Sequence, residues 1–172
     1  MDFLELAKKR YSVREFTDRP VEKEKIYAIL EAARIAPTAA NNQPQRILVI
    51  ESKEAIEKLD DCTTCRFNAP LAFLVCYDKT KTWARHYDGH NSGDVDSSIV
   101  GTHIMMEAED LGLGSVWVMS FDPEKIKQTY NLPEEFEPVA IFSVGCADEK
   151  SKPGKMHFDK KSLEETTFYN RF

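Results

Sequence analysis

The run from Leu71 to Tyr77, which reads LAFLVCY, is the longest uninterrupted apolar stretch in the sequence. A strand with one wet face alternates apolar and polar residues, but this run is apolar at every position. Both of its faces are therefore expected to be covered, as in a strand at the centre of a sheet with helices on either side. The run is also much too short to cross a bilayer, which takes about 20 apolar residues.

Outward from this strand, helical and extended patterns alternate along the chain. In the clearest helix, apolar residues recur at three- and four-residue spacing from Val21 to Ala33, and Pro37 ends the pattern. The same reasoning gives helices over 1–10, 53–59, 95–111 and from 123, and strands over 46–51, 115–120 and 139–145. This order predicts a three-layer helix–sheet–helix domain that spans residues 1–172, and by itself it favours a parallel sheet.

The composition and the net charge argue against several classes of function. The 172 residues include 23 basic and 29 acidic side chains, which gives a net charge of −6. This balance argues against a general role in coating nucleic acid or anionic membranes. Four cysteines are too few for a disulfide scaffold, and the acidic start Met1-Asp2-Phe3-Leu4-Glu5 lacks the basic region of a signal peptide. We therefore expect a cytoplasmic protein with reduced thiols.

The motif Arg10-Tyr-Ser-Val-Arg14 is the first candidate site. In an extended segment Arg10, Ser12 and Arg14 point to one side, while Tyr11 and Val13 point to the other and anchor the segment to the core. Two guanidinium groups and a hydroxyl on one side suit a phosphate, because they supply charge-assisted donors. The alternative is a solvated edge strand that pairs with nearby acids.

Two further motifs can line a ligand site. Ala36 to Gln45 (APTAANNQPQ) follows a helix end and combines small residues with three consecutive amides, whose donors and acceptors match the edge of a heterocycle. The alternative is an ordinary polar loop. The strand that ends at Ser120 precedes a capped helix, a place where α/β sheets bind ligands. Simple core packing of Trp117 and its neighbours is the alternative there.

In this order, the three motifs resemble the FMN-dependent nitroreductase family. The resemblance covers nearly the whole chain and includes the basic segment from His157 to Glu165 near its end. It implies an α+β three-layer fold with a mostly antiparallel sheet, and a homodimer with non-covalent FMN at its interface. It also implies an oxidoreductase that passes hydride from NAD(P)H through FMN to a small organic acceptor such as a nitroaromatic or a quinone, by a ping-pong scheme and without a catalytic acid–base pair.

The same resemblance assigns roles to residues. Arg10, Ser12 and Arg14 correspond to the family's phosphate and ribityl contacts, and either Lys160 or Lys161 assists them. The stretch with Pro37, Thr38, Ala39 and Asn41 corresponds to a contribution from the partner subunit, and Met119 and Ser120 lie beside the isoalloxazine. The full set of expected cofactor-binding residues is Arg10, Tyr11, Ser12, Arg14, Pro37, Thr38, Ala39, Asn41, Gln43, Trp117, Met119, Ser120, Lys160 and Lys161.

A rival hypothesis starts from Cys62-Thr-Thr-Cys65. With His86 and His90 this pair gives a zinc-finger-like spacing, and a non-catalytic flavin- or metal-binding protein with a thiol or zinc site would follow. The gap between the cysteines and histidines exceeds the usual length, and the strand from Leu71 lies inside it. Structural cysteines are the simpler interpretation.

Two segments fit no regular element. Residues 79–93 are polar and aromatic without a clean period, and they predict a long irregular loop, which is called the excursion below. The chain ends in Phe168-Tyr-Asn-Arg-Phe172. Because a solvated tail rarely ends in three aromatic residues, we expect this tail to dock on another surface.

Overall fold

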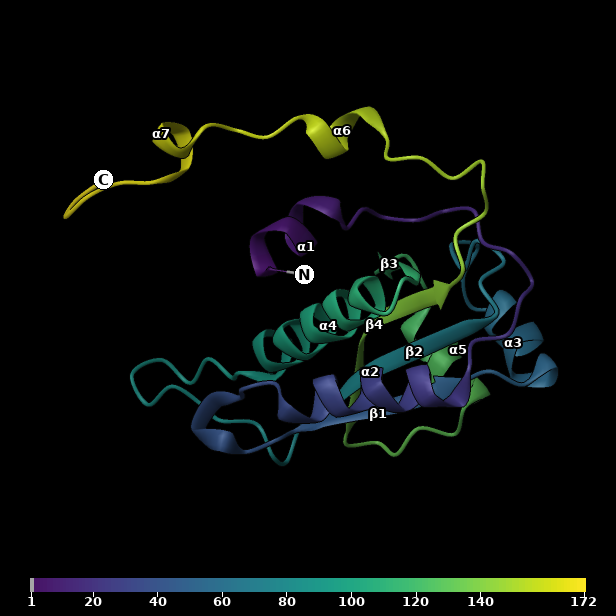
Figure 1. Ribbon diagram of the computed structural model, residues 1–172. Coiled ribbons are helices and arrows are strands. Elements are labelled where there is room, and N and C mark those ends of the chain that lie inside the picture. Colours follow the sequence, from purple (N-terminus) through teal and green to yellow (C-terminus); the bar gives the residue numbers. More distant parts are fainter. Residues whose placement is uncertain (1) are drawn as a thin grey trace.

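The computed structural model describes residues 2–172 as an antiparallel sheet between two helical layers (Figure 1). The strands are ordered β1-β2-β4-β3 across the sheet. The strands are β1 (Gln45–Ile50), β2 (Leu71–Asp78), β3 (Gly114–Val118) and β4 (Phe136–Gly145). The helices are α1 (Phe3–Lys9), α2 (Lys23–Ile35), η1 (Ala39–Asn41), α3 (Lys53–Asp60), α4 (Gly93–Asp110), α5 (Pro123–Thr129), α6 (Lys155–Phe158) and α7 (Leu163–Thr166).

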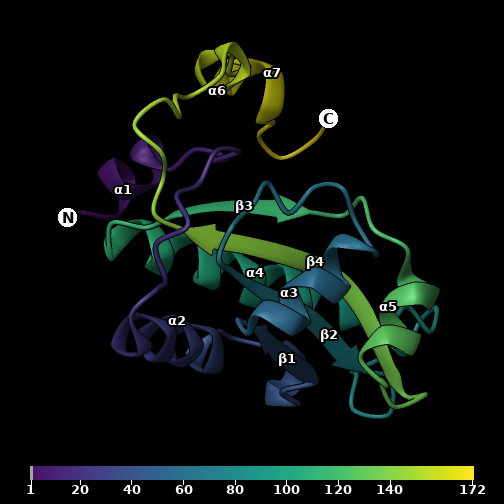
Figure 2. The same cartoon turned by 90° about the vertical axis from the view of Figure 1, so that its right-hand side faces the viewer.

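The apolar run forms β2, an inner strand of the sheet, as expected. All eight of its residues are buried. Its odd positions Leu71, Phe73 and Val75 pack into one core, which α2 and α4 cover, and its even positions pack into a second core on the opposite face. Figures 1 and 2 show α2 and α4 on one side of the sheet and α3 and α5 on the other. The three-layer α+β architecture is therefore confirmed.

The parallel sheet favoured by helix–strand alternation is wrong. All three strand pairs run antiparallel, as the family resemblance implies. The reason is that α3 and the loop after it bring the chain back to the sheet end where β1 finishes, so that Ile50 lies opposite Ala72. A helix between two strands is compatible with either direction, and only the end to which the chain returns decides between them.

The segment after α1 lies along the edge of the sheet beside β3. Ser12 forms an isolated parallel bridge with Ser115, and the Val13 amide donates to the Ser115 carbonyl at 3.0 Å. Val13 is 1% exposed and packs so close to Gly114 that any Cβ there would lie 2.6 Å from its Cγ2. The expected anchoring of this segment by Val13 is therefore present.

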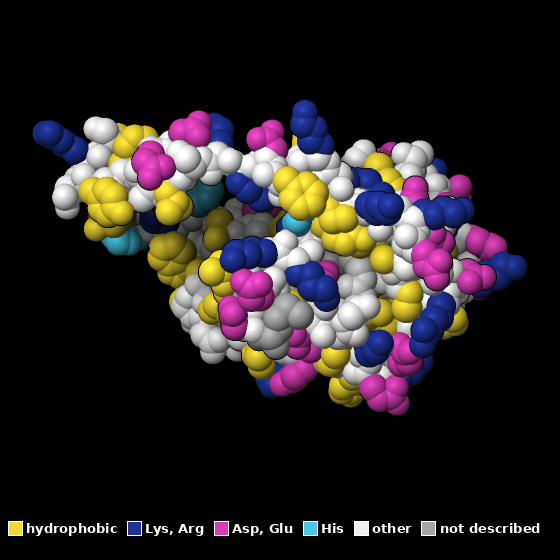
Figure 3. Space-filling model, turned by 45° about the horizontal axis from the view of Figure 1, so that its top comes forward, with side chains coloured by type: hydrophobic (Ala, Val, Ile, Leu, Met, Phe, Trp, Pro, Cys, Tyr) yellow, Lys and Arg dark blue, Asp and Glu magenta, His cyan; other side chains and the backbone are white. Residues whose placement is uncertain are grey.

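The chain beyond Lys152 leaves the body as an arm that carries α6 and α7 (Figures 1 and 3). Apolar side chains along it are exposed in this chain: Met156, Phe158, Leu163, Phe168, Tyr169 and Phe172. The arm contacts its own chain at α6, where the His157 ring stands edge-on to the Tyr11 ring with 6.3 Å between their centres, and its apolar side chains named above stay exposed. Across residues 2–172, no helix has both the length and the apolar character that a membrane crossing requires.

Candidate functional site

A polar cavity of about 690 Å³ lies between the segment after α1 and the loop that joins α3 to β2. Arg14 and Phe16 line it from one side, and Phe67 and Asn68 line it from the other. Lys150, near the start of the arm, also lines it. Its volume falls within the range of roughly 300–1,000 Å³ that is typical of small-molecule sites.

The charges in this cavity are unevenly paired. Asp60 is neutralised by Arg66, which gives it two hydrogen bonds of 2.5 and 2.6 Å. Arg14 and Lys150 make no ion pair with any carboxylate among residues 2–172, although Glu15 and Asp148 also line the cavity. The Arg14 guanidinium carbon lies 6.0 Å from the centre of the Phe67 ring. Two unpaired cations beside an aromatic ring can bind the polar edge or the anionic group of a flat ligand.

The cavity floor depends on a strained turn that sequence reasoning missed. Phe67 and Asn68 have φ angles of 58° and 59°, a left-handed conformation that Asn tolerates and Phe rarely adopts. Arg66 holds this turn by donating to the Ala69 carbonyl at 2.6 Å. The Asn-Ala-Pro sequence before the buried strand is a turn signal that indicates the turn but not its function.

The other residues of the first motif lie close to this cavity but do not line it. Arg10 ends α1, and Ser12 is held against Ser115 of β3. The Tyr11 hydroxyl donates to the Ser151 carbonyl at 3.3 Å, which ties the segment to the root of the arm. Within one chain, only Arg14 of the three expected phosphate ligands faces the cavity.

The end of β3 lies next to this cavity. The Thr63 hydroxyl, which lines the cavity, donates to the Ser120 carbonyl at 2.6 Å, so Ser120 lies one hydrogen bond away from it. Met119 is 69% exposed. The Trp117 ring packs edge-on against Phe142, and its buried Nε1 has no hydrogen-bond partner among residues 2–172. The strand ends at Val118, two residues earlier than expected, because Met119 and Ser120 already form the turn into α5.

Residues 38–43, here named the amide loop, adopt an unusual backbone. Ala40, Asn41 and Gln43 all have φ angles between 50° and 56°, although none of them is glycine. Several such residues in one short segment are costly and persist where the surroundings enforce them. Hydrogen bonds supply that enforcement: the Gln43 amide donates to the Thr38 hydroxyl at 3.1 Å, and the Ala39 amide donates to Asp96 at 2.8 Å. Pro37 and the amide side chains of this loop are exposed.

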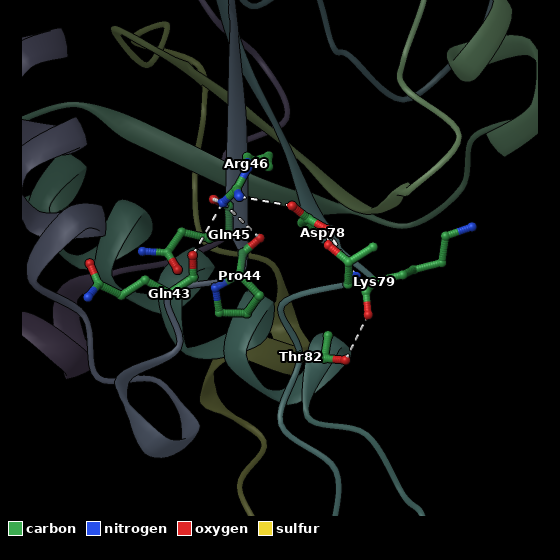
Figure 4. Close-up of polar contacts among 8 residues, drawn as sticks. Gln43, Pro44, Gln45, Arg46, Asp78, Lys79 and Thr82 are labelled. Atoms are coloured by element: carbon green, nitrogen blue, oxygen red, sulfur yellow. Dashed lines mark hydrogen bonds and ion pairs between the residues drawn. The ribbon is translucent and has the colours of Figure 1, made fainter.

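The amide loop is also fixed where it enters β1 (Figure 4). Nη1 of Arg46 donates to the carbonyls of Gln43, Pro44 and Gln45 at 2.9–3.3 Å. Its Nη2 pairs with the carboxylate of Asp78 at 3.0 Å. The Thr80 hydroxyl, which donates to the same carboxylate, and Arg46 hold the pKa of Asp78 below its ordinary value. Sequence reasoning assigned no role to Arg46 or Asp78.

The cavity and the amide loop lie at opposite ends of β2. Asn68 and Leu71 stand at the cavity end, whereas Gln45 pairs with Tyr77 at the other end. At about 3.3 Å per residue, the strand separates the two ends by roughly 23 Å. Lys160 and Lys161 lie on the arm, exposed and without an ion pair among residues 2–172. One chain therefore does not bring all the expected cofactor-binding residues together.

The cysteines of the rival hypothesis are part of the core. Cys62 is buried and its thiol lies 3.4 Å from the Lys58 carbonyl, to which it donates. His86 and His90 sit on the exposed excursion after β2. Between residues 2 and 172, no three His, Cys, Asp or Glu side chains form a cluster that could hold a metal ion.

Comparison with known proteins identifies the family. A model described as the nitroreductase family matches residues 7–70 and 62–146. A curated relative from Archaeoglobus fulgidus, provisionally named NADH dehydrogenase/NAD(P)H nitroreductase, is 30% identical over 91% of this chain and 97% of its own length. The crystal structure of a nitroreductase family protein from Clostridium difficile 630 is 46% identical, with a TM-score of 0.94 and 100% coverage of both chains.

A second solved structure bears on the cofactor. It is an FMN-dependent nitroreductase from Clostridium difficile R20291, 29% identical, with a TM-score of 0.81 over 99% of this chain and 100% of the other. Both structures cover the sheet, the cavity and the amide loop described above, and the family model covers the same parts except Asp148 and Lys150 of the cavity. On sequence and on fold alike, the chain belongs to the nitroreductase family.

Proposed function

We propose that this protein is an FMN-dependent NAD(P)H oxidoreductase that reduces a small organic acceptor such as a nitroaromatic or a quinone. The observation that carries the proposal is the polar cavity in a nitroreductase fold: Arg14 lies over the Phe67 ring, Lys150 lines the same cavity, and neither cation forms an ion pair among residues 2–172. Bound FMN would supply the hydride-transfer chemistry that links NAD(P)H to the acceptor.

The residues of the cavity fit this cofactor. Arg14 and Lys150 supply positive charge, the Asn68 amide supplies a donor and an acceptor, and the Phe67 ring supplies a flat apolar surface. The protein's part in the reaction is to bind and orient the ring and to leave one face open to NAD(P)H and the acceptor. The strained turn at Phe67 and Asn68 is consistent with such a binding role.

Two observations support a homodimer with a shared site. First, the cavity and the amide loop lie at opposite ends of β2, so a second chain in reversed orientation would bring its amide loop to the first chain's cavity. Second, the arm exposes six large apolar side chains, which favours burial against a partner rather than in water. A docked arm would also carry Lys160 and Lys161 to a site formed by both chains.

A titration of the apoprotein with FMN tests the cofactor assignment. Arg14→Ala should weaken FMN binding by about 2 kcal/mol, roughly a thirtyfold rise in Kd, because an anionic ligand loses a charge-assisted partner. Arg19→Ala is the matched control, since Arg19 is exposed on the same segment and pairs with Glu22 instead. Wild-type protein that binds no FMN would overturn the assignment, and an unchanged Kd for Arg14→Ala would remove Arg14 from the site.

A mixed dimer tests whether the site is shared. Arg14→Glu places an acid in the cavity, and Asn41→Lys adds bulk to the amide loop, so each homodimer should lose FMN. If Arg14 of one chain and the amide loop of its partner form one site, one site of the mixed dimer carries both substitutions. The other site then carries neither. The mixed dimer should therefore bind one FMN, half the wild-type amount. A folded mixed dimer without flavin would refute the shared site and leave the FMN assignment standing.

A further inference from the structure

The carboxylate of Asp96 is buried at the start of α4, with 1% of the residue exposed, and it forms no ion pair among residues 2–172. Burying a charge is unfavourable unless hydrogen bonds satisfy it. Two hydrogen-bond donors satisfy the Asp96 carboxylate, and neither belongs to the backbone hydrogen bonding of α4. The Ala39 amide of the amide loop donates to Oδ1 at 2.8 Å, and the Ser92 hydroxyl donates to Oδ2 at 2.7 Å. The helix N-terminus adds favourable dipoles.

Ser92 connects this carboxylate to the excursion between β2 and α4. Its hydroxyl accepts from the Trp83 amide at 3.1 Å, and its own amide donates to the Trp83 carbonyl at 2.8 Å. Between these two residues the excursion is a hairpin, closed by a bridge from Ala84 to Asn91. Asp96 therefore links the amide loop on one side to the end of the excursion on the other.

A second carboxylate makes the same link at the start of the excursion. Asp78 accepts from Arg46, which also donates to the carbonyls of Gln43, Pro44 and Gln45 where the amide loop enters β1 (Figure 4). Asp78 also accepts from both the amide and the hydroxyl of Thr80. The amide loop and the excursion are thus tied to each other at both ends. The strained backbone of Ala40 and Asn41 lies between these ties.

We propose that Asp96 is a positioning residue for the FMN site, because it holds the amide loop in its left-handed conformation and joins it to the excursion as one unit. This inference rests on the proposed function. The choice of aspartate follows from the two donors: a carboxylate accepts from Ala39 and Ser92 at once. Asparagine still accepts from Ala39, and its amide can donate to the Ser92 hydroxyl oxygen. Alanine loses both bonds.

Two measurements test the proposal on the full-length protein. The first is trypsin cleavage of the apoprotein at Lys79, Lys81 or Arg85 in the excursion, which reports opening of this segment without any cofactor. The second is the Kd for FMN from fluorescence titration. Asp96→Ala should speed cleavage and raise the Kd for FMN, each at least about tenfold, whereas Asp96→Asn should stay within about threefold of wild type for both.

Controls separate positioning from general stability. Ser97→Ala changes a buried serine of the same helix whose hydroxyl has no partner among residues 2–172, and it should alter neither quantity. Tyr130→Phe removes a hydrogen bond on the other face of the sheet, and it should lower Tm without changing the Kd for FMN. Ser92→Ala keeps the Asp96 bond to Ala39 and the backbone bond from residue 92 to Trp83, but it removes the hydroxyl that joins Asp96 to the Trp83 amide. It should therefore speed cleavage, and it stands in if Asp96→Ala does not fold.

The outcomes are distinct. Faster cleavage together with a raised Kd supports the proposal. Unchanged cleavage in folded Asp96→Ala and Ser92→Ala overturns the link between the loop and the excursion, and an unchanged Kd in folded Asp96→Ala overturns the positioning role. An equal loss of FMN affinity in Tyr130→Phe also overturns it, because the effect would then follow stability alone. If the wild-type protein binds no FMN, the proposed function fails. The cleavage data would still test the link between the amide loop and the excursion.

Discussion

Replacement of Gly101 by alanine should show how tightly α4 is packed against the sheet. Gly101 is buried within α4, and a Cβ there would lie 2.1 Å from Cζ and 2.9 Å from Cε1 of Phe142. The Phe142 ring is fully buried and packs edge-on against Trp117, with 4.9 Å between ring centres. The ring therefore has no free space to move into, and the helix itself must shift.

Two opposing effects determine how much Gly101→Ala changes the free energy of unfolding. Alanine favours a helix interior over glycine by about 1 kcal/mol. Overpacking a dense core costs about 1–3 kcal/mol, occasionally more. Because the overlap with Cζ exceeds 1 Å relative to ordinary contact distances, from 3.4 Å upward, we take the upper end. The expected net loss is about 2 kcal/mol, which lowers Tm by roughly 4–8 °C for a chain of this size.

Thermal and urea unfolding at one fixed protein concentration would measure this loss, since any dimer makes stability depend on concentration. Gly154→Ala is the matched control, because a Cβ there meets no atom within 4 Å. The double variant Gly101→Ala/Phe142→Leu should be more stable than the two single losses added together, because the smaller side chain relieves the overlap. Gly101→Ala with wild-type or higher stability would refute the packing argument.

Three further predictions concern single interactions. The pKa of Asp78 is lowered by the Thr80 hydroxyl and then by Arg46, so its contribution to stability is present above the unfolded pKa of about 4 and is lost as the pH falls through the folded value. The stability gap between wild type and Asp78→Asn in urea titrations should therefore shrink from pH 6 to pH 3, and a constant gap would contradict this. Changing Cys62 and Cys65 together to alanine should leave FMN content and NAD(P)H oxidation nearly intact, and a loss beyond about tenfold in kcat/KM of a folded variant (about 1.4 kcal/mol) would revive a redox role. Tyr130→Phe should cost about 1 kcal/mol in thermal unfolding, since its hydroxyl donates to the Ala55 carbonyl at 2.8 Å, and an unchanged Tm would show that this bond contributes nothing.

Of the predicted cofactor-binding residues, the cavity of one chain contains Arg14, and the arrangement of the cavity in space was not predicted. Arg14 is found in the cavity, and Val13 anchors its segment as expected. Phe67 and Asn68 escaped notice because a left-handed φ at two non-glycine residues is set by surrounding contacts, here those of Arg66, and leaves little trace in local sequence. Asp96 escaped notice for a related reason: its partner Ala39 is 57 residues away along the chain.

What the sequence alone determined is the layered core. The unbroken apolar run from Leu71 to Tyr77 requires cover on both faces, and the helical spacing of Val21 to Ala33 provides one of the covering helices, because burial of apolar surface acts on local patterns. The tertiary structure decided strand direction, the opposite placement of the cavity and the amide loop, and the exposure of the arm. These depend on which end of the sheet each connection returns to, and that is set by long-range packing and hydrogen bonds rather than by any local pattern.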